Sequence, residues 1–338
     1  MGEQMNENKD ADRKKEHIEL ALRSQLSSWT NDKRFNYEPL LGKHPGEKEY
    51  DIDFLGKKMR FPMWVSSMTG GTPEARKINE NLSKACNEFG LGMGLGSCRI
   101  LLENPTYMRE FAMRPIIGLE QPLFANLGIA QIEKAIKNKS VGKIEEMVAM
   151  LQADGLIIHV NPFQEWIQPE GDRISMPAIE LIEQFSEQSD LSLIIKEVGQ
   201  GMGPESLKRL MKLPVVIEFG AFGGTNFSQL EISRREGETG HLNDLAFMGH
   251  NFEEMLESFN ELLENESQNQ FKKVIVSGGI KNFLDGYYAV QKLNTNCIYG
   301  QASSLLNTAR TSYDALKAYI QEQIKGYNLA AEYLTIRK

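Results

Sequence analysis

No run of apolar residues in the 338-residue sequence approaches the length of a membrane-spanning helix. The first dozen residues are polar and charged, without an apolar core, so we expect no signal peptide. Lys and Arg are scattered rather than striped, and the net charge of −8 favours neither a nucleic-acid partner nor an anionic membrane. These absences predict a cytoplasmic protein that must bind any phosphate ligand at a local site.

Cysteine is scarce as well, and the three that are present form an odd set without CxxC spacing: Cys86, Cys98 and Cys297. This usage fits a reducing compartment and argues against a zinc site, so we interpret all three as buried thiols. The sequence has no internal repeat, low-complexity stretch or linker. Its length suits one large barrel or two ordinary domains.

From Met63 onward, short apolar runs alternate with helix-length amphipathic segments, which is typical of a parallel sheet wrapped by helices. The runs cover residues 63–67, 91–95, 122–126, 156–159, 193–197, 215–218, 273–277 and 297–299, with helices expected between them at residues 75–89, 177–188 and 282–293. Eight such units predict an α/β fold, a TIM (β/α)8 barrel. A doubly wound sheet is the alternative, but it needs fewer strands and a glycine-rich turn after its first strand, whereas the glycine-rich run at residues 90–96 occupies the second.

The remaining segments are assigned around this barrel. We expect a polar tail at residues 1–12 and a single domain over residues 13–338, with the barrel itself at residues 62–338. A short amphipathic helix is expected at residues 13–26, and a hairpin at residues 50–61 that turns at residues 55–57. The one long insertion, predicted as a loop, covers residues 228–249 after the sixth strand.

Small and polar residues follow every predicted strand, at the end where a barrel carries its active site. The motifs are SSMTGG (66–71), GSCR (96–99), ANLG (125–128), HVNPFQE (159–165), KEVGQG (196–201), GGTNF (223–227), SGGI (277–280) and YGQAS (299–303). A single glycine pair is more often a tight turn than a phosphate site. The pairs after strands six and seven, together with the turn at residues 300–302, indicate a phosphorylated cofactor, because barrel phosphate sites are usually built there.

The fourth strand is followed by the richest polar segment, HVNPFQEWIQPEGDR at residues 159–173. His159 and Asn161 are two residues apart on an extended chain, so they point to the same side. Pro162 then turns the backbone and brings Gln164 and Glu165 to the same mouth. Three oxygen-bearing side chains and an imidazole suit a hard cation that holds a phosphorylated ligand. The alternative is a polar loop with a hydrogen-bonded histidine.

Lys196 ends the apolar strand LSLIIK and should therefore be partly buried beside an anionic partner. A salt bridge to Glu197 or Glu218 is one reading of this lysine. A bound anionic ligand is an equally open alternative.

These motifs together resemble the type 2 isopentenyl diphosphate isomerase family. The likeness rests on SSMTGG, GMGLGS, ANLG, HVNPFQEWIQPEGDR, KEVG, GGTNF with Glu231 and Arg234 downstream, and SGGI, and it runs from residues 13–17 to the last strand. The resemblance implies an FMN-dependent TIM barrel that uses reduced flavin and Mg²⁺, with NADPH as reductant, in isoprenoid biosynthesis. Such enzymes interconvert isopentenyl and dimethylallyl diphosphate without net redox change, and they assemble as homotetramers or octamers.

The resemblance also implies roles for individual residues. FMN would be held by Ser67, Met68, Thr69, Ser97, Asn126, Lys196, Thr225, Gly278, Gly279, Gly300 and Ala302. The substrate diphosphate and the catalytic centre would be framed by His159, Asn161 and Gln164, with Glu165 as the Mg²⁺ ligand and Arg13, Lys14 and His17 reaching over the diphosphate. The chain departs from the family pattern at Cys98, where many members have Gln, at residues 217–222, where an Asp-containing version is commoner, and at Gln301, where Leu or Arg is usual.

The chemistry of the residues agrees with this resemblance. Moving a double bond along an isopentenyl unit requires a proton to be added at one carbon and removed from another. His159 is the one obvious acid or base near neutral pH in the predicted mouth, so the reduced flavin itself is a plausible proton carrier. A lysine about 4 Å from the flavin edge would favour the anionic reduced form by roughly 4 kcal/mol before desolvation, at an effective dielectric near 20.

Two other functions remain open at this point. A flavin-dependent 2-hydroxy-acid oxidase would use the same fold but needs a His base beside Arg residues that clamp a carboxylate. The sequence has Glu165 next to Gln164 instead, which would repel a carboxylate substrate and accept a Mg²⁺-diphosphate. A non-catalytic flavin-binding protein is the third hypothesis.

Overall fold

A computed structural model describes residues 16–18, 20–46, 48–235, 242–265 and 273–337. The chain divides into two compact units, one made of Met1–Glu38 with Leu334–Lys338 and the other of Pro39–Tyr333. The predicted tail at residues 1–12 lies outside the described residues, and the single domain over residues 13–338 stays a prediction. No helix in the described ranges is long and apolar enough to cross a membrane.

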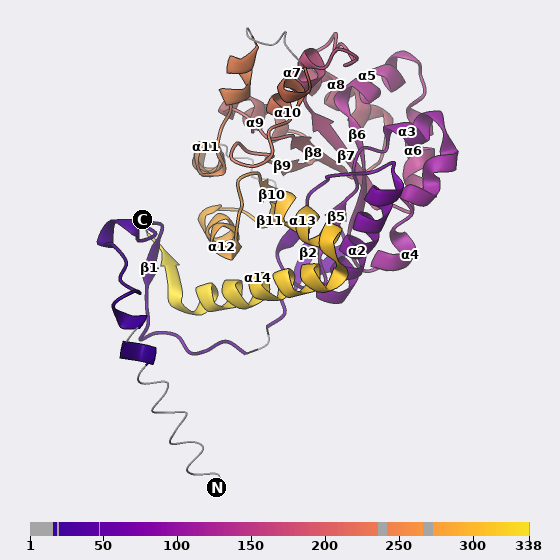
Figure 1. Ribbon diagram of the computed structural model, residues 1–338. Helices are drawn as coiled ribbons and strands as arrows, with labels where there is room; N and C mark the ends of the chain where they lie inside the picture. The colour runs from indigo at the N-terminus through magenta and orange to yellow at the C-terminus, as the bar shows by residue number, and fades with distance from the viewer. Residues whose placement is uncertain (1–15, 19, 47, 236–241, 266–272, 338) are drawn as a thin grey trace. The chain divides into compact units, whose positions relative to one another are not determined.

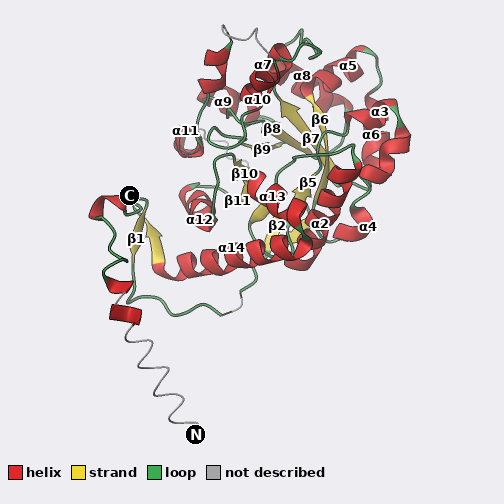
Figure 2. Ribbon diagram, viewed as in Figure 1, coloured by secondary structure: helices red, strands yellow, loops and turns green. Residues whose placement is uncertain are grey.

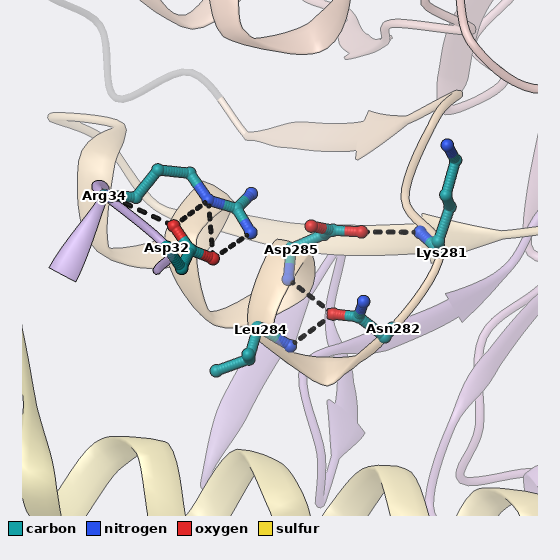
Figure 3. A network of polar contacts seen from close by, with 6 residues as sticks. All are labelled: Asp32, Arg34, Lys281, Asn282, Leu284 and Asp285. Carbon is teal, nitrogen blue, oxygen red and sulfur yellow. Dashed lines mark hydrogen bonds and ion pairs between the residues drawn. The ribbon is translucent and has the colours of Figure 1, made fainter. Parts of the chain in front are cut away.

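The smaller unit contains a two-stranded antiparallel sheet, in which β1 (Phe35–Tyr37) pairs with β12 (Leu334–Ile336) after the short helix η1 (Ser28–Thr30). Asp32 accepts hydrogen bonds from the backbone and the guanidinium of Arg34 before β1 begins (Figure 3). The helix predicted at residues 13–26 is shorter, because within its described part only residues 16–18, 20 and 21 are helical. The Ser24 hydroxyl bonds the Leu20 carbonyl at 2.8 Å where the helix ends.

The larger unit is a closed barrel of eight parallel strands wrapped by helices (Figures 1 and 2). Its strands are β4 (Met63–Val65), β5 (Gly92–Gly94), β6 (Leu123–Gly128), β7 (Gly155–Val160), β8 (Leu193–Glu197), β9 (Val216–Glu218), β10 (Val274–Ser277) and β11 (Cys297–Gln301). Neighbours in sequence are neighbours in the barrel, and β11 closes it against β4. The predicted TIM barrel is thus confirmed, and each predicted apolar run overlaps a strand.

The strands are apolar along their length because the barrel buries both of their faces. Every residue of β6 and β8 is buried. Inside the barrel, Phe54, Trp64, Phe124, Ile157 and Ile194 belong to one apolar cluster. This cluster fills the interior, so polar chemistry is left to the strand ends.

The helices that surround the barrel include the three predicted at residues 75–89, 177–188 and 282–293, which are α2 (Pro73–Phe89), α8 (Ala178–Gln188) and α12 (Phe283–Lys292). The others are α3 (Arg99–Glu103), η2 (Pro105–Glu110), α4 (Arg114–Ile117), α5 (Ile129–Lys137), α6 (Val141–Met150), α7 (Pro162–Ile167), α9 (Pro204–Leu210), α10 (Phe227–Arg234), η3 (Asn243–Phe247), α11 (Phe252–Asn265), α13 (Ser303–Thr311) and α14 (Tyr313–Tyr333). Helix α2 begins where the Thr72 side chain accepts the Ala75 N–H, and it ends at Gly90 with φ of 67°.

Three predictions need correction. The hairpin of β2 (Ile52–Phe54) and β3 (Lys57–Met59) turns at Leu55 and Gly56, because Lys57 already pairs with Phe54. The segment at residues 228–249 is not simply a loop: α10 covers its start, capped by the Asn226 side chain, and η3 lies near its end. Residues 236–241 of that segment lie outside the described ranges. Cys86 and Cys98 are buried as expected, whereas Cys297 is partly exposed.

Candidate functional site

A cavity of about 390 Å³ opens at the carboxyl ends of β4, β8, β9, β10 and β11. Seven of the eleven predicted cofactor residues line it: Ser67, Lys196, Thr225, Gly278, Gly279, Gly300 and Ala302. The other four, Met68, Thr69, Ser97 and Asn126, come from the ends of β4, β5 and β6 but do not line this cavity. Most of the predicted cofactor residues therefore lie around this one cavity.

Two glycine loops form one corner of this cavity. Gly278 has φ of 86°, and a Cβ there would lie 2.1 Å from the Ala221 oxygen, so only glycine fits. A Cβ on Gly224 would lie 3.2 Å from the Gly279 nitrogen, which shows how closely the loops after β9 and β10 approach each other. Helix α13 begins beside them at Ser303. Tight glycine turns and the start of a helix both present backbone N–H groups, so this corner suits an anionic group such as phosphate.

The loop after β10 is fixed by the start of α12 (Figure 3). The Asn282 side-chain oxygen accepts the N–H groups of Leu284 and Asp285 at 2.9 and 3.1 Å. The Asp285 carboxylate in turn accepts the Lys281 N–H at 2.9 Å. These bonds hold the residues that follow Gly278 and Gly279, so the corner is preformed.

Lys196 lies in the wall of the cavity, in register with His159 on β7 and Glu218 on β9. Its Nζ donates to the backbone oxygen of Glu197 at 3.2 Å. Among the described residues, no carboxylate lies within ion-pair distance of this Nζ. Burial lowers the pKa of Lys196, while the charges of Glu218 and Glu197 oppose that shift. Lys196 therefore forms no direct salt bridge to Glu197 or Glu218. This favours the alternative, in which Lys196 binds an anionic ligand.

Some polar atoms in the cavity wall have no partner within the described part of the chain. They include Ser67 Oγ and Gln301 Nε2. The Gln301 side-chain oxygen is held by the Tyr319 hydroxyl at 2.9 Å, which leaves the amide nitrogen unsatisfied. Because buried polar groups are nearly always hydrogen-bonded, these atoms indicate a bound ligand with polar edges.

A smaller cavity of about 280 Å³ shares the wall residues Glu197 and Val198 with the first one. It is lined by Asn161 and Gln164, among others. Glu197 shapes the loop between the two cavities, because its carboxylate accepts three backbone N–H groups, from Gly199, Gln200 and Gly201, at 2.5–2.9 Å. The motifs assign Glu197 no such role, although a carboxylate before two glycines is a signal for a loop of this kind.

His159 is neutral near neutral pH. Its Nδ1 lies 2.8 Å from the Asn126 side-chain oxygen, so Nδ1 donates and Nε2 is left as an acceptor. Burial, with further contributions from the charges of Lys196 and Arg99, lowers the pKa of His159 to about 3. The expectation that His159 is an acid or base near neutral pH is thus wrong, because barrel closure desolvates the ring.

The start of α7 brings three predicted residues together. Asn161 precedes Pro162, and its Nδ2 donates to Gln164 Oε1 at 3.0 Å and to Glu165 Oε1 at 3.1 Å. Glu165 also accepts the Asp172 N–H at 2.8 Å. His159 bonds Asn126 instead, so hydrogen bonds link three of the four side chains, and their expected convergence with His159 on one point stays a prediction. The chain becomes helical at Pro162, so Gln164 and Glu165 lie in the first turn of α7.

Gln164 is oriented by a residue far along the chain. Its Nε2 donates to the Glu231 carboxylate of α10 at 3.2 Å, and Arg234 pairs with the same carboxylate at 3.1 Å. Glu231 is 3% exposed, so this bond is shielded from water. The resemblance named Glu231 and Arg234, but only the fold places them against Gln164.

A metal ion would need ligands from elsewhere. Within the described ranges no group of three or more His, Cys, Asp or Glu side chains could hold one. Glu165 is a buried carboxylate with the Asn161 amide beside it. Mg²⁺ is commonly held by one or two carboxylates together with substrate phosphates, so this donor set fits a metal that arrives with a diphosphate. Arg13 and Lys14 lie outside the described residues, and His17 is exposed in the smaller unit.

Comparison with solved structures supports the fold class. A mandelate oxidase variant with a monooxide FMN adduct superposes with a TM-score of 0.56 at 13% identity, covering 90% of this chain and 88% of that one. The recombinant flavin-binding domain of baker's yeast flavocytochrome b2 superposes with a TM-score of 0.59 at 14% identity, covering 88% and 71%. At such low identity the likeness establishes the fold, a TIM barrel with its cavity at the strand ends.

Sequence comparison then defines the family. The isopentenyl-diphosphate delta-isomerase of Rickettsia typhi is 33% identical over 325 residues, which cover 94% of this chain and 91% of that protein. The enzyme of the same name from Rickettsia prowazekii is 32% identical over 324 residues, with the same coverage. No protein-family model matches the chain. The chain belongs to the isopentenyl-diphosphate delta-isomerase family.

Proposed function

We propose that this protein interconverts isopentenyl and dimethylallyl diphosphate by the type 2 reaction, with reduced FMN, Mg²⁺ and NADPH as the initial reductant. The observation that carries the proposal is the identity of 33% over 94% of the chain to an isopentenyl-diphosphate delta-isomerase, together with a phosphate-type cavity at the barrel mouth. The fold neighbours contribute a second argument, since one is a mandelate oxidase variant with an FMN adduct and the other is a flavin-binding domain.

The residues present fit FMN. The glycine corner would hold its phosphate, and Ser67 and Gln301 supply unsatisfied polar atoms for its polar edges. Lys196 would hold the charge of the reduced ring, since it lies in the cavity wall without a carboxylate partner at ion-pair distance among the described residues. In its reduced form, FMN supplies ring positions that can carry a proton close to the substrate.

The substrate would occupy the second cavity, next to the wall that Glu197 and Val198 share with the first. Gln164, fixed by Glu231, would present its amide to the hydrocarbon part of the substrate. His159 would bind the diphosphate as a neutral side chain, since its pKa is lowered to about 3. These residues position and shield the substrate, while the proton transfer needs no strong acid among them.

Glu165 would bind the Mg²⁺ that bridges to the diphosphate. Its two oxygens lie beside Asn161 Nδ2 and the Asp172 N–H, which orient the carboxylate. Arg13, Lys14 and His17 of the N-terminal segment would contact the diphosphate. We further propose that the protein acts in the cytoplasm as a homotetramer or octamer, which light scattering on the purified protein would test.

Isomerisation in D₂O tests the reaction. We expect one FMN per chain, deuterium in the product, and a flavin that stays reduced through many turnovers after one dose of reductant without oxygen. Oxidation of the flavin in step with product, or NADPH consumed one for one, would overturn the isomerase.

The fold neighbours raise a second candidate, a 2-hydroxy-acid oxidase. Anaerobic addition of lactate or mandelate to the oxidised FMN protein distinguishes it. We expect no bleaching of the flavin, because the mouth offers Glu165 and Gln164 where such an enzyme needs positive charge.

A further inference from the structure

One buried carboxylate in the wall of the cofactor cavity has no role in the proposed reaction. Glu218, the last residue of β9, is 0% exposed. Ser66 donates to its Oε1 at 2.6 Å, and its Oε2 has no hydrogen-bond partner among the described residues. The neutral side chains of Ser66, Ser277 and Trp64 also stabilise the carboxylate. Neutral partners are a poor replacement for water around a carboxylate, so a buried Glu218 calls for a positive charge nearby.

Lys196 is the cation next to it. The two residues are directly paired on adjacent strands, and on parallel strands such a pair has its side chains on the same face of the sheet. Each lies within the electrostatic field of the other, and the field opposes the effect of burial on both: burial raises the pKa of Glu218 and lowers that of Lys196. The charge of one group therefore depends on the charge of the other.

The other charged and titratable groups around Lys196 do not replace Glu218. His159 on β7 is neutral, since its pKa is lowered to about 3. Glu197 turns its carboxylate to the backbone N–H groups of the loop after β8 and offers Lys196 only its backbone oxygen. Arg99 acts on His159 and adds positive charge, which disfavours a second cation. Glu218 is thus the carboxylate left to balance Lys196.

We propose that Glu218 is a positioning residue that keeps Lys196 protonated in the wall of the cofactor cavity. Glu218 also lines the cavity, but it is 0% exposed and directly paired with Lys196, so we assign its effect to the charge of Lys196. The inference rests on the proposed function only in taking FMN as the occupant. It adds that the positive charge of Lys196 beside the reduced flavin depends on Glu218.

The first experiment needs no cofactor. Lysine side chains labelled with ¹⁵N are titrated by NMR in the parent and in Glu218→Gln, and Lys196→Met identifies the Lys196 signal. We expect the proton affinity of Lys196 to fall at least tenfold in Glu218→Gln, because a neutral amide cannot stabilise the ammonium. An unchanged Lys196 titration overturns the proposal whether or not the protein is an isomerase.

The second experiment follows the reduced flavin between pH 6 and 10, without oxygen and without substrate. We expect the parent to keep an anionic reduced spectrum and Lys196→Met to shift towards the neutral form. Glu218→Gln should follow the parent at low pH and Lys196→Met at high pH, with the change where Lys196 loses its proton. A Glu218→Gln spectrum that matches the parent throughout would contradict the inference.

Two further variants separate charge from folding. Glu218→Asp keeps the carboxylate and should behave as the parent, so it tests the inference if Glu218→Gln does not fold. Glu133→Gln alters a different buried carboxylate, 3% exposed and bonded to Ser175, and should leave both titrations unchanged. A shift in Glu133→Gln as large as that in Glu218→Gln would show a general loss of structure and overturn the specific role.

Discussion

The two ends of the barrel carry cavities of similar size but opposite chemistry. At the amino end, a cavity of about 450 Å³ is lined by paired polar groups: Lys273 pairs with Asp53 at 2.7 Å, and the Tyr50 hydroxyl donates to Asn328 at 2.9 Å. At the carboxyl end, the cavity of about 390 Å³ has unpartnered buried atoms in its wall. Size therefore does not mark the functional site, whereas unsatisfied polarity does.

The glycines of the two ends differ in the same way. Gly56 in the hairpin has φ of 81°, and a Cβ there would meet nothing within 4 Å. Gly278 has φ of 86°, but its Cβ would overlap the Ala221 backbone. The first glycine meets only the local demand of a turn, while the second also makes room for a neighbouring loop.

The largest expected effect is that of Gly278→Ala compared with Gly56→Ala. Both place alanine at positive φ, which costs about 1–2 kcal/mol. Gly278→Ala must also displace the loop at Ala221, so we expect FMN binding to be lost, whereas Gly56→Ala should lower only stability. Isothermal titration with FMN and urea unfolding measure the two effects. FMN binding by Gly278→Ala with parental affinity would contradict the assigned phosphate corner.

A lysine at each end sharpens the comparison. Lys196→Met should weaken FMN binding about tenfold or more, because it removes a buried charge from the cavity wall. Lys273→Met breaks an ion pair whose side chains are 27% and 54% exposed, and such pairs contribute less than about 1 kcal/mol. We expect Lys273→Met to bind FMN as the parent does. Equal losses of FMN affinity in the two variants would remove the distinction between the ends.

Glu165→Gln and Glu133→Gln compare two buried carboxylates close to the segment after β7. Glu165→Gln should raise the Mg²⁺ concentration needed for activity about tenfold, with little change in FMN affinity. Glu133 bonds Ser175 and pairs with Lys137 at 2.9 Å, so Glu133→Gln should cost about 1–2 kcal/mol of stability and leave the Mg²⁺ requirement unchanged. Mg²⁺ titrations of both variants check this, and an unaltered requirement in Glu165→Gln would make that carboxylate structural.

The last expected effect, a pH dependence from His159, is confined to acid pH and does not change the comparison at neutral pH. Its pKa is 6.5 in the unfolded chain and about 3 in the folded chain, so between these values the unfolded state binds more protons. Stability should therefore be unaffected above pH 6.5 and fall below it, by at most about 1.4 kcal/mol per pH unit. Urea unfolding at pH 7.5 and 5 should show a shallower loss in His159→Gln than in the parent. Identical losses would mean that His159 ionises normally.

Much of the fold and part of the site could be predicted from the sequence because they depend on local pattern. Each apolar run became a strand since a parallel barrel buries both strand faces. Parallel strands also bring all their carboxyl ends to one mouth of the barrel, so the sequence alone predicts that the motifs after the strands lie there. Gly278, Gly279 and Thr225 gathered around one cavity for this reason.

Only the tertiary structure decided how these residues interact. His159 was expected beside Asn161 but bonds Asn126, 33 residues earlier, and Gln164 bonds Glu231, 67 residues later. The position of Glu218 beside Lys196 likewise follows from the pairing of β8 with β9. The pattern of apolar runs in the sequence predicts which residues are buried and which follow the end of a strand. Protonation and hydrogen-bond partners depend on desolvation and on distances between strands, which exist only once the barrel closes.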